Sequence, residues 1–174
     1  MTQYAIITAI AVLLAAAPGA RSSGPAGQST AGALAIIVHR SNPVDNLTRP
    51  ELRRIFMIET QTWSNGRKIT VMLREKGQPE RSEAIRLISG LSEEQYDRHI
   101  LLQTFRGAIN QGPREILSAA AMLRFVFNVP GAIGFVSAAE ADDSTKVLRI
   151  DGMLPGDAQY PLSVRARPAA RGED

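Results

Sequence analysis

Hydrophobic residues in this chain form short continuous runs, rich in branched side chains, which are separated by longer stretches of helical periodicity. A short apolar run bounded by turn residues is typical of a strand that is buried on both faces of a sheet. The runs predict strands over residues 34–38, 69–73, 131–136 and 146–150. Gly131 and Gly134 lie in the third run, and glycine within a strand indicates that another element comes close to its backbone.

Helix signals occupy the stretches between these runs. Thr48 followed by Glu51, and Ser92 followed by Gln95, have the spacing of a capping box, in which the two side chains satisfy free N–H groups of the first turn. Pro79 fits the first turn of a further helix, because its missing N–H has no intrahelical use there. The predicted helices cover residues 49–57, 79–90, 92–105 and 114–128, with a loop over 107–113.

The helix that begins at Ser92 carries Tyr96 and Ile100 on one face and Leu101 and Phe105 on an adjoining strip. Apolar side chains at helical spacing are usually the ones that a helix buries against its own domain. We therefore expect all four of these side chains to pack inward.

Composition narrows the class of protein. A length of 174 residues is enough for one domain with a substantial core. The absence of cysteine excludes disulfides, thiolate metal sites and a cysteine nucleophile. The formal net charge is only +3 and the two signs are interleaved, whereas nucleic-acid binding needs clustered positive charge with aromatic side chains for stacking. A nucleic-acid partner is therefore not expected.

The N-terminal segment differs from the rest of the chain. Residues 5–17 contain one polar residue, Thr8, and this run is too short to span a bilayer but suits the apolar part of a secretory signal. The small residues Ala17 and Gly19 indicate a cleavage site, so residues 1–20 are interpreted as a signal peptide and the protein as periplasmic or secreted. The alternative is a buried N-terminal helix. Residues 21–33 have the composition of a flexible linker and residues 165–174 that of a disordered tail.

Motifs for chemistry are scarce. His39 and His99 have no second histidine or paired carboxylate at ligand spacing, so the sequence predicts neither a metal site nor catalysis from them. No glycine-rich phosphate loop of a nucleotide-binding type occurs, and no cofactor is predicted. We therefore interpret the chain as a binding protein rather than an enzyme.

One turn has the geometry of an anion-binding site. Arg74 ends a predicted strand, Gly77 forms the turn, and a helix begins directly after Gln78. This arrangement presents free N–H groups and the positive end of the helix dipole, to which an arginine adds a two-pronged fork. The candidate ligand-binding residues are Arg74, Gly77, Gln78 and Arg81, with Arg81 expected to be the more exposed arginine. The alternative is that both arginines form surface ion pairs with Glu75, Glu80 or Glu83.

Several segments, in order along the chain, resemble the phosphate-binding receptors of bacterial ABC transporters, which have the type 2 periplasmic-binding-protein fold. The resemblance covers about residues 37–163. It rests on Asn42-Pro43 with Leu52-Arg53-Arg54-Ile55-Phe56, on Trp63-Ser64-Asn65-Gly66-Arg67, on Pro130-Gly131-Ala132-Ile133-Gly134-Phe135-Val136, and on Tyr160-Pro161-Leu162.

The resemblance implies an α/β fold over residues 34–164, with a central mixed sheet flanked by helices, and it matches mainly one of the family's two lobes. It also implies phosphate or another oxyanion as the ligand, and an ABC permease or another envelope protein as a partner. Where the family has Ser-Gly-Thr after its arginine, this chain has Gln78-Pro79-Glu80, which removes hydroxyl donors and adds a negative charge. Weak binding is therefore expected. The alternative is a ligand-free interaction module whose exposed half-cleft binds a partner or a second copy of the chain.

The signal-peptide interpretation predicts the mass of the native protein. If the chain is exported by the general secretory route, cleavage after Gly19 leaves a product that begins at Ala20. Intact-mass spectrometry of the protein purified from its native cell envelope measures this directly. A full-length product in the cytoplasmic fraction would contradict the interpretation.

Overall fold

A computed structural model describes residues 32–163. The predicted signal peptide over 1–20, most of the predicted linker over 21–33 and the predicted tail over 165–174 lie outside these residues. In the described part, no helix is both long enough and apolar enough to cross a membrane.

Seven strands are present in the described residues: β1 Leu34–Val38, β2 Asn46–Leu47, β3 Thr70–Arg74, β4 Arg114–Ile116, β5 Ala132–Ser137, β6 Lys146–Val147 and β7 Arg149–Ile150. Five of them form one sheet in the order β4-β3-β5-β1-β6. Strand β3 is parallel to both β4 and β5, whereas β1 is antiparallel to β5 and β6. The sheet is therefore mixed, as predicted. Strands β2 and β7 pair in parallel as a separate small sheet.

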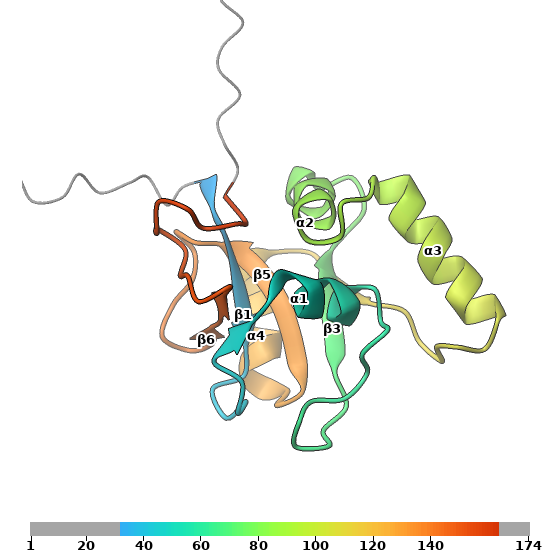
Figure 1. Cartoon of the computed structure of the whole chain (residues 1–174), viewed down its shortest axis with the longest axis horizontal. Helices are drawn as coiled ribbons and strands as arrows, with labels where there is room; N and C mark the ends of the chain where they lie inside the picture. Colours follow the sequence, from blue (N-terminus) through green and yellow to red (C-terminus); the bar gives the residue numbers. More distant parts are fainter. Residues whose placement is uncertain (1–31, 164–174) are drawn as a thin grey trace, which may run out of the picture.

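Four helices accompany the sheet: α1 Arg49–Phe56, α2 Pro79–Ser89, α3 Glu93–Phe105 and α4 Ala119–Asn128. Helix α4 packs on one face of the sheet, and α1 and α2 lie over the other (Figure 1). Helix α3 packs against α2 and extends away from the sheet (Figure 1). The predicted class, a central mixed sheet flanked by helices, is confirmed.

Strand β1 is buried on both faces, as its continuous apolar run predicted. Ile36 belongs to the larger core cluster under α1 and α2, whereas Ile37 belongs to the smaller cluster under α4. Gly134 in β5 permits the close packing of α4, because a Cβ atom at this position would lie 2.6 Å from the Met122 sulfur. The predicted close approach at this glycine is therefore confirmed.

The predicted caps are confirmed at both helices. The Thr48 side chain accepts a hydrogen bond from the Glu51 N–H, and the Glu51 carboxylate accepts from the Thr48 N–H in return. Ser92 and Gln95 make the same reciprocal pair at the start of α3. Each capping box satisfies donors that the first helical turn leaves free, which explains why both helices begin where the sequence indicated.

Two predicted elements are divided in the structure. The helix expected over 114–128 begins only at Ala119, because residues 114–116 pair with β3 as strand β4 and Ser118 then caps α4. The strand expected over 146–150 is split at Leu148, whose N–H donates to the carbonyl of Ile36, into β6 and β7 in different sheets. Both differences come from pairing partners that are distant in the sequence.

The inward packing expected along α3 is correct for only part of the helix. Tyr96 is buried and Ile100 is half-buried, but Leu101 is 55% exposed and Phe105 is 80% exposed. Tyr96 and Ile100 face the domain, whereas the C-terminal half of α3 extends beyond α2 (Figure 1).

Two buried tyrosine hydroxyls predict how stability changes at alkaline pH. Tyr96 donates to the Phe56 carbonyl at 2.7 Å and Tyr160 donates to the Leu34 carbonyl at 2.9 Å. Burial raises the pKa of both tyrosines well above the usual 10.0. As the pH rises, the two tyrosines therefore ionise in the unfolded chain before they do so in the folded one. Their contribution to the free energy of unfolding is fully present below pH 10.0 and is lost as the pH rises above it.

We expect Tyr96→Phe to reduce the alkaline loss of stability by as much as about 1.4 kcal/mol per pH unit. At neutral pH the same variant loses about 1 kcal/mol through the missing hydrogen bond. Urea denaturation at a series of pH values from neutral to above 10 measures both effects. Parallel stability curves for the variant and the wild type would contradict this assignment.

Candidate functional site

The predicted anion-binding turn lies at one edge of the sheet. Because β3 is parallel to both β4 and β5, the carboxyl ends of the three strands share this edge. Helix α2 follows β3 and α4 follows β4, so the N-termini of both helices lie there as well. In open α/β sheets, ligands bind beyond the carboxyl ends of strands, where helix N-termini favour negative charge.

Arg74 is the last residue of β3 and its side chain lines a small cavity at this edge. The cavity has a volume of about 20 Å³, which holds about one water molecule. Within the described residues, the buried Nη1 atom of Arg74 has no hydrogen-bond partner and the side chain forms no salt bridge. The lining residues are Arg74, Glu80, Ala119, Phe135, Val136, Ser137 and Glu140. Arg74 is therefore a charged donor with unused hydrogen-bonding capacity.

The turn itself is built by Gly77 and Gln78. Gly77 has a positive φ of 83°, a conformation that favours glycine. Gln78 precedes α2 without capping it through its side chain, and its own N–H donates to the Glu75 carbonyl at 3.3 Å. Pro79 has no N–H, so this first turn offers fewer free donors than the sequence pattern alone suggests.

Arg81 is located on the other side of the turn and is only 2% exposed. Its Nη1 donates to the Arg74 carbonyl at 2.9 Å, and its guanidinium pairs with three carboxylates. The distances are 2.6 Å from Nε to Glu93, 2.9 Å from Nη2 to Asp97 and 3.2 Å from Nη1 to Glu115. The Nε contact is an ion pair rather than an aligned hydrogen bond. Arg81 thus acts within the domain as a positioning residue for the end of β3.

The expected exposure of Arg81 is therefore wrong, and the alternative of surface ion pairs with its sequence neighbours is wrong for this arginine as well. Glu93 and Asp97 come from α3 and Glu115 from β4, so only the tertiary structure brings these carboxylates to α2. Glu83, one of the partners in that alternative, pairs instead with Arg86. Of the four predicted residues, Arg74 lines the cavity, and Gly77 and Gln78 form the turn beside it. Arg81 lies on α2 and faces the carboxylates of α3 and β4 instead.

Sequence reasoning did not identify Ser137 and Glu140, which line the cavity from the end of β5. The Glu140 carboxylate accepts a hydrogen bond from the Ser137 N–H at 3.2 Å. Together with Glu80, this places two carboxylates in the same cavity as Arg74. The parallel pairing of β3 with β5 was the signal that would have found them, because it places both strand ends at one edge.

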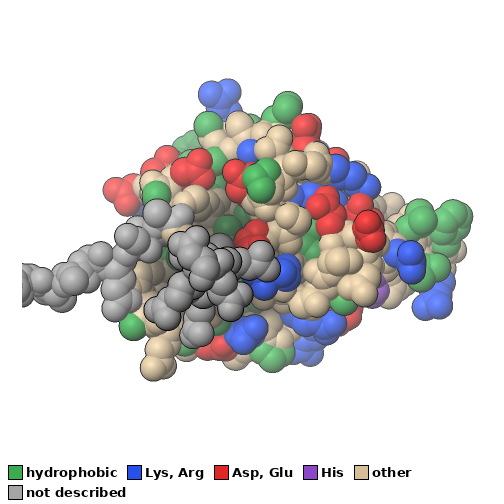
Figure 2. Space-filling view, turned by 90° about the horizontal axis from the view of Figure 1, so that it is seen from above, with side chains coloured by type: hydrophobic (Ala, Val, Ile, Leu, Met, Phe, Trp, Pro, Cys, Tyr) green, Lys and Arg blue, Asp and Glu red, His purple; other side chains and the backbone are tan. Residues whose placement is uncertain are grey.

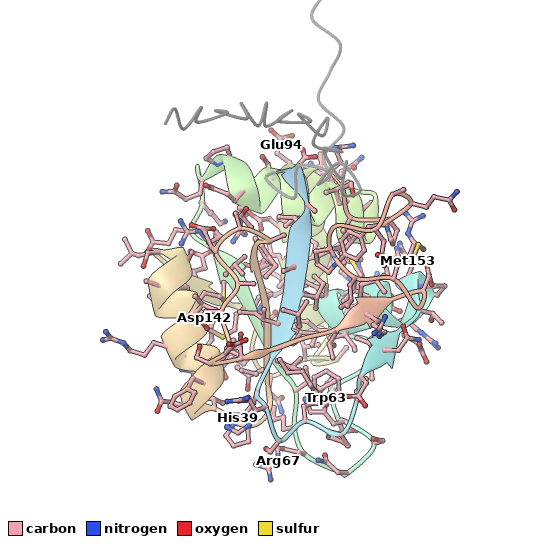
Figure 3. The ribbon with its side chains drawn as sticks, turned by 90° about the vertical axis from the view of Figure 1, so that its left-hand side faces the viewer. His39, Trp63, Arg67, Glu94, Asp142 and Met153 are labelled. Atoms are coloured by element: carbon pink, nitrogen blue, oxygen red, sulfur yellow. The ribbon has the colours of Figure 1, made fainter. Side chains whose placement is uncertain are left out.

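Neither histidine lines this cavity. His39 follows β1 at the opposite end of the molecule from Glu94, which lies at the start of α3 (Figure 3). Its Nδ1 accepts from both the N–H and the hydroxyl of Ser41, a local contact at the surface. Within residues 32–163, no group of three or more histidine, aspartate and glutamate side chains is arranged to hold a metal ion.

Comparison with known proteins assigns the fold to a family. A family model described as the PBP superfamily domain matches residues 28–164. The chain belongs to this PBP superfamily, and the resemblance noted from the sequence is confirmed.

Solved structures agree with this assignment. The chain is similar to an ABC-type phosphate transport receptor from Vibrio cholerae, with a TM-score of 0.61 and 25% identity over 75% of this chain and 53% of that one. A putative phosphate ABC transporter substrate-binding protein with bound phosphate, from Clostridium perfringens, has a TM-score of 0.59 and 22% identity over 71% of this chain and 46% of that one. The second likeness is evidence for the fold alone. The chain thus spans about half the length of the receptors that it matches.

The position of Arg81 predicts that it matters more to stability than an ordinary surface arginine. Arg81→Met leaves three carboxylates without their cation and the Arg74 carbonyl without its donor. We expect a loss of about 2 to 4 kcal/mol, below the usual cost of breaking a buried pair because the carboxylates are 25–43% exposed.

Arg86→Met is the matched control, since Arg86 lies on the same helix but is 61% exposed and, among the described residues, pairs with Glu83 alone. We expect it to change the free energy of unfolding by less than about 0.5 kcal/mol. Urea denaturation of both variants makes the comparison. Equal effects would show that the Arg81 cluster is no stronger than a surface ion pair.

Proposed function

We propose that this chain is an exported solute-binding domain that captures phosphate or a similar oxyanion, weakly, at the edge where β3 and β5 end. The observation that carries the proposal is Arg74, whose buried Nη1 lacks a partner in the described structure. A guanidinium with a free fork, beside two helix N-termini, is suited to bind a tetrahedral oxyanion. The membership of the PBP superfamily and the likeness to phosphate receptors support this ligand class.

Three features make the proposed binding weak. The cavity beside Arg74 is smaller than a phosphate ion, so the anion would have to bind at its mouth. Glu80 and Glu140 repel an anion there, and no second lobe within the described residues covers the edge. One charged hydrogen-bonding group and a helix dipole together contribute about 2 to 4 kcal/mol to the free energy of binding. This corresponds to a dissociation constant of roughly 1 mM or more.

The proposed partners follow from the same assignment. A receptor domain of this kind would deliver its anion to an ABC permease or to another envelope protein. We propose a binding role without catalysis, because the family members that this chain resembles are transport receptors.

The competing function is an interaction module that has lost its ligand and uses the same edge to bind a partner. Two observations favour it. Glu80 and Glu140 leave the cavity with more negative than positive charge, and Leu117, directly before the cap of α4, is 69% exposed. A partner that presents a cationic side chain next to an apolar one would match this edge.

Nuclear magnetic resonance titration of the domain with phosphate, at constant ionic strength, distinguishes the two functions. We expect amide shifts around the β3–α2 turn, and we expect Arg74→Ala to weaken binding by roughly ten- to hundredfold. The double variant Gln78→Ser/Glu80→Thr should tighten binding, because it removes a repelling charge and restores two hydroxyl donors.

Arg54→Ala is the control for nonspecific attraction. Arg54 lies in a broad groove of about 800 Å³ between α1 and α2, which is also lined by Arg49, Arg53 and Arg86. This variant should leave the shifts at the β3–α2 turn unchanged. Absence of phosphate binding in both the wild type and the double variant would refute the anion-binding proposal.

A further inference from the structure

The C-terminal half of α3 exposes a compact group of large apolar side chains. Leu101, Leu102 and Phe105 are 55%, 47% and 80% exposed, and they account for three of the five large exposed hydrophobic residues in the described part. Figure 2 shows hydrophobic side chains gathered at the far end of the projecting arm that Figure 1 identifies as α3. An exposed apolar group of this kind marks an interaction surface.

These side chains form one stripe along the helix. Arg98, Leu101, Leu102 and Phe105 have the spacing i, i+3, i+4 and i+7, which places them on one face over two turns. All four are exposed, whereas Tyr96 on the opposite side is buried against the domain. We call these four residues the α3 stripe. It is apolar in the middle, with a cation at one end and an aromatic ring at the other.

We propose that the α3 stripe is the contact surface of a homodimer, in which α3 packs antiparallel to α3 of a second copy. A two-fold axis between Leu101 and Leu102 brings Leu101 of each copy against Leu102 of the other. Phe105 and Arg98 lie at equal distances from this axis along the helix, on opposite sides of it. The axis therefore places Phe105 of each copy over Arg98 of the other. The stripe is therefore self-complementary, which is the requirement for a two-fold contact.

The charges on α3 favour the antiparallel orientation of the two copies. A guanidinium over an aromatic face makes a favourable cation–π contact, and each dimer contains two. A parallel arrangement would instead place Arg98 against Arg98 and Glu94 against Glu94. The antiparallel one also directs Glu94, in the first turn of α3, toward Arg106 at the end of the other helix. This contact is separate from the sheet edge where β3 and β5 end, which we call the Arg74 edge. It does not depend on anion binding.

Sedimentation velocity over a range of protein concentrations tests the dimer. We expect the wild type to pass from monomer to dimer as its concentration rises. Phe105→Lys places a cation opposite Arg98, and it should raise the dimer dissociation constant by roughly five- to thirtyfold or more. Adding Arg98→Glu to this variant creates an opposite-charge pair across the axis and should restore much of the association.

Phe127→Lys is the matched control, because Phe127 is 51% exposed on α4, away from the stripe. It should leave the dissociation constant unchanged. Thermal melting of all variants checks that each remains folded, which is expected since every substituted side chain is exposed.

Cross-linking then locates the axis, and the lack of any native cysteine makes single-cysteine variants unambiguous. Leu102→Cys should form a covalent dimer on oxidation or with a short bifunctional thiol reagent, because the two sulfurs lie close to the axis. Glu80→Cys, at the Arg74 edge, should not. Three results would each overturn the proposal: a monomer at every concentration, an unchanged dimer in Phe105→Lys, or cross-linking through Glu80→Cys but not Leu102→Cys.

Discussion

The cluster of ion pairs and hydrogen bonds around the Arg81 guanidinium is the interaction on which the rest of this structure most depends. It lies on α2, holds the carbonyl at the end of β3, and pairs with carboxylates from α3 and β4. Its planar fork can serve several partners in fixed directions at once, which a lysine ammonium does not do. A buried cation is tolerable here because three carboxylates neutralise it and remain partly hydrated themselves.

Both proposed binding surfaces depend on the contacts of Arg81. By holding the Arg74 carbonyl, Arg81 fixes the end of β3, while the side chain of Arg74 lines the cavity with Ser137. By pairing with Glu93 and Asp97, it anchors only the first turns of α3. The remaining turns project from the domain and expose the α3 stripe. The same contact therefore supports the strand edge and determines which part of α3 is left free.

The anion site proposed at the strand edge is expected to bind its ligand more weakly than an enclosed receptor site would. In a two-lobed receptor, the second lobe encloses the ligand and removes it from water, which strengthens every charged contact. The chain spans about half of such a receptor, and its described residues place two carboxylates in the cavity beside Arg74. The proposed dimer contact on α3 is separate from this edge, so it does not compete with the proposed binding of an anion or a partner at Arg74.

The amino-acid sequence by itself determined most of the elements. The branched run at 34–38 specified a strand buried on both faces, the capping boxes at Thr48 and Ser92 specified two helix starts, and the ordered motifs specified the family. These features depend on hydrogen bonds and periodicities within a few residues, so they can be read locally. Arg74 and Gly77 were placed correctly at the strand end and the turn for the same reason.

Only the tertiary structure decided which side chains face one another. Residues 114–116 became a strand because β3 was available as a partner, and Arg81 became buried because α3 and β4 supply its carboxylates. Leu101 and Phe105 have the spacing of core residues, yet they are exposed because the domain ends before it reaches them. A helical pattern shows that two residues share a face, but what that face meets depends on segments far away in the chain.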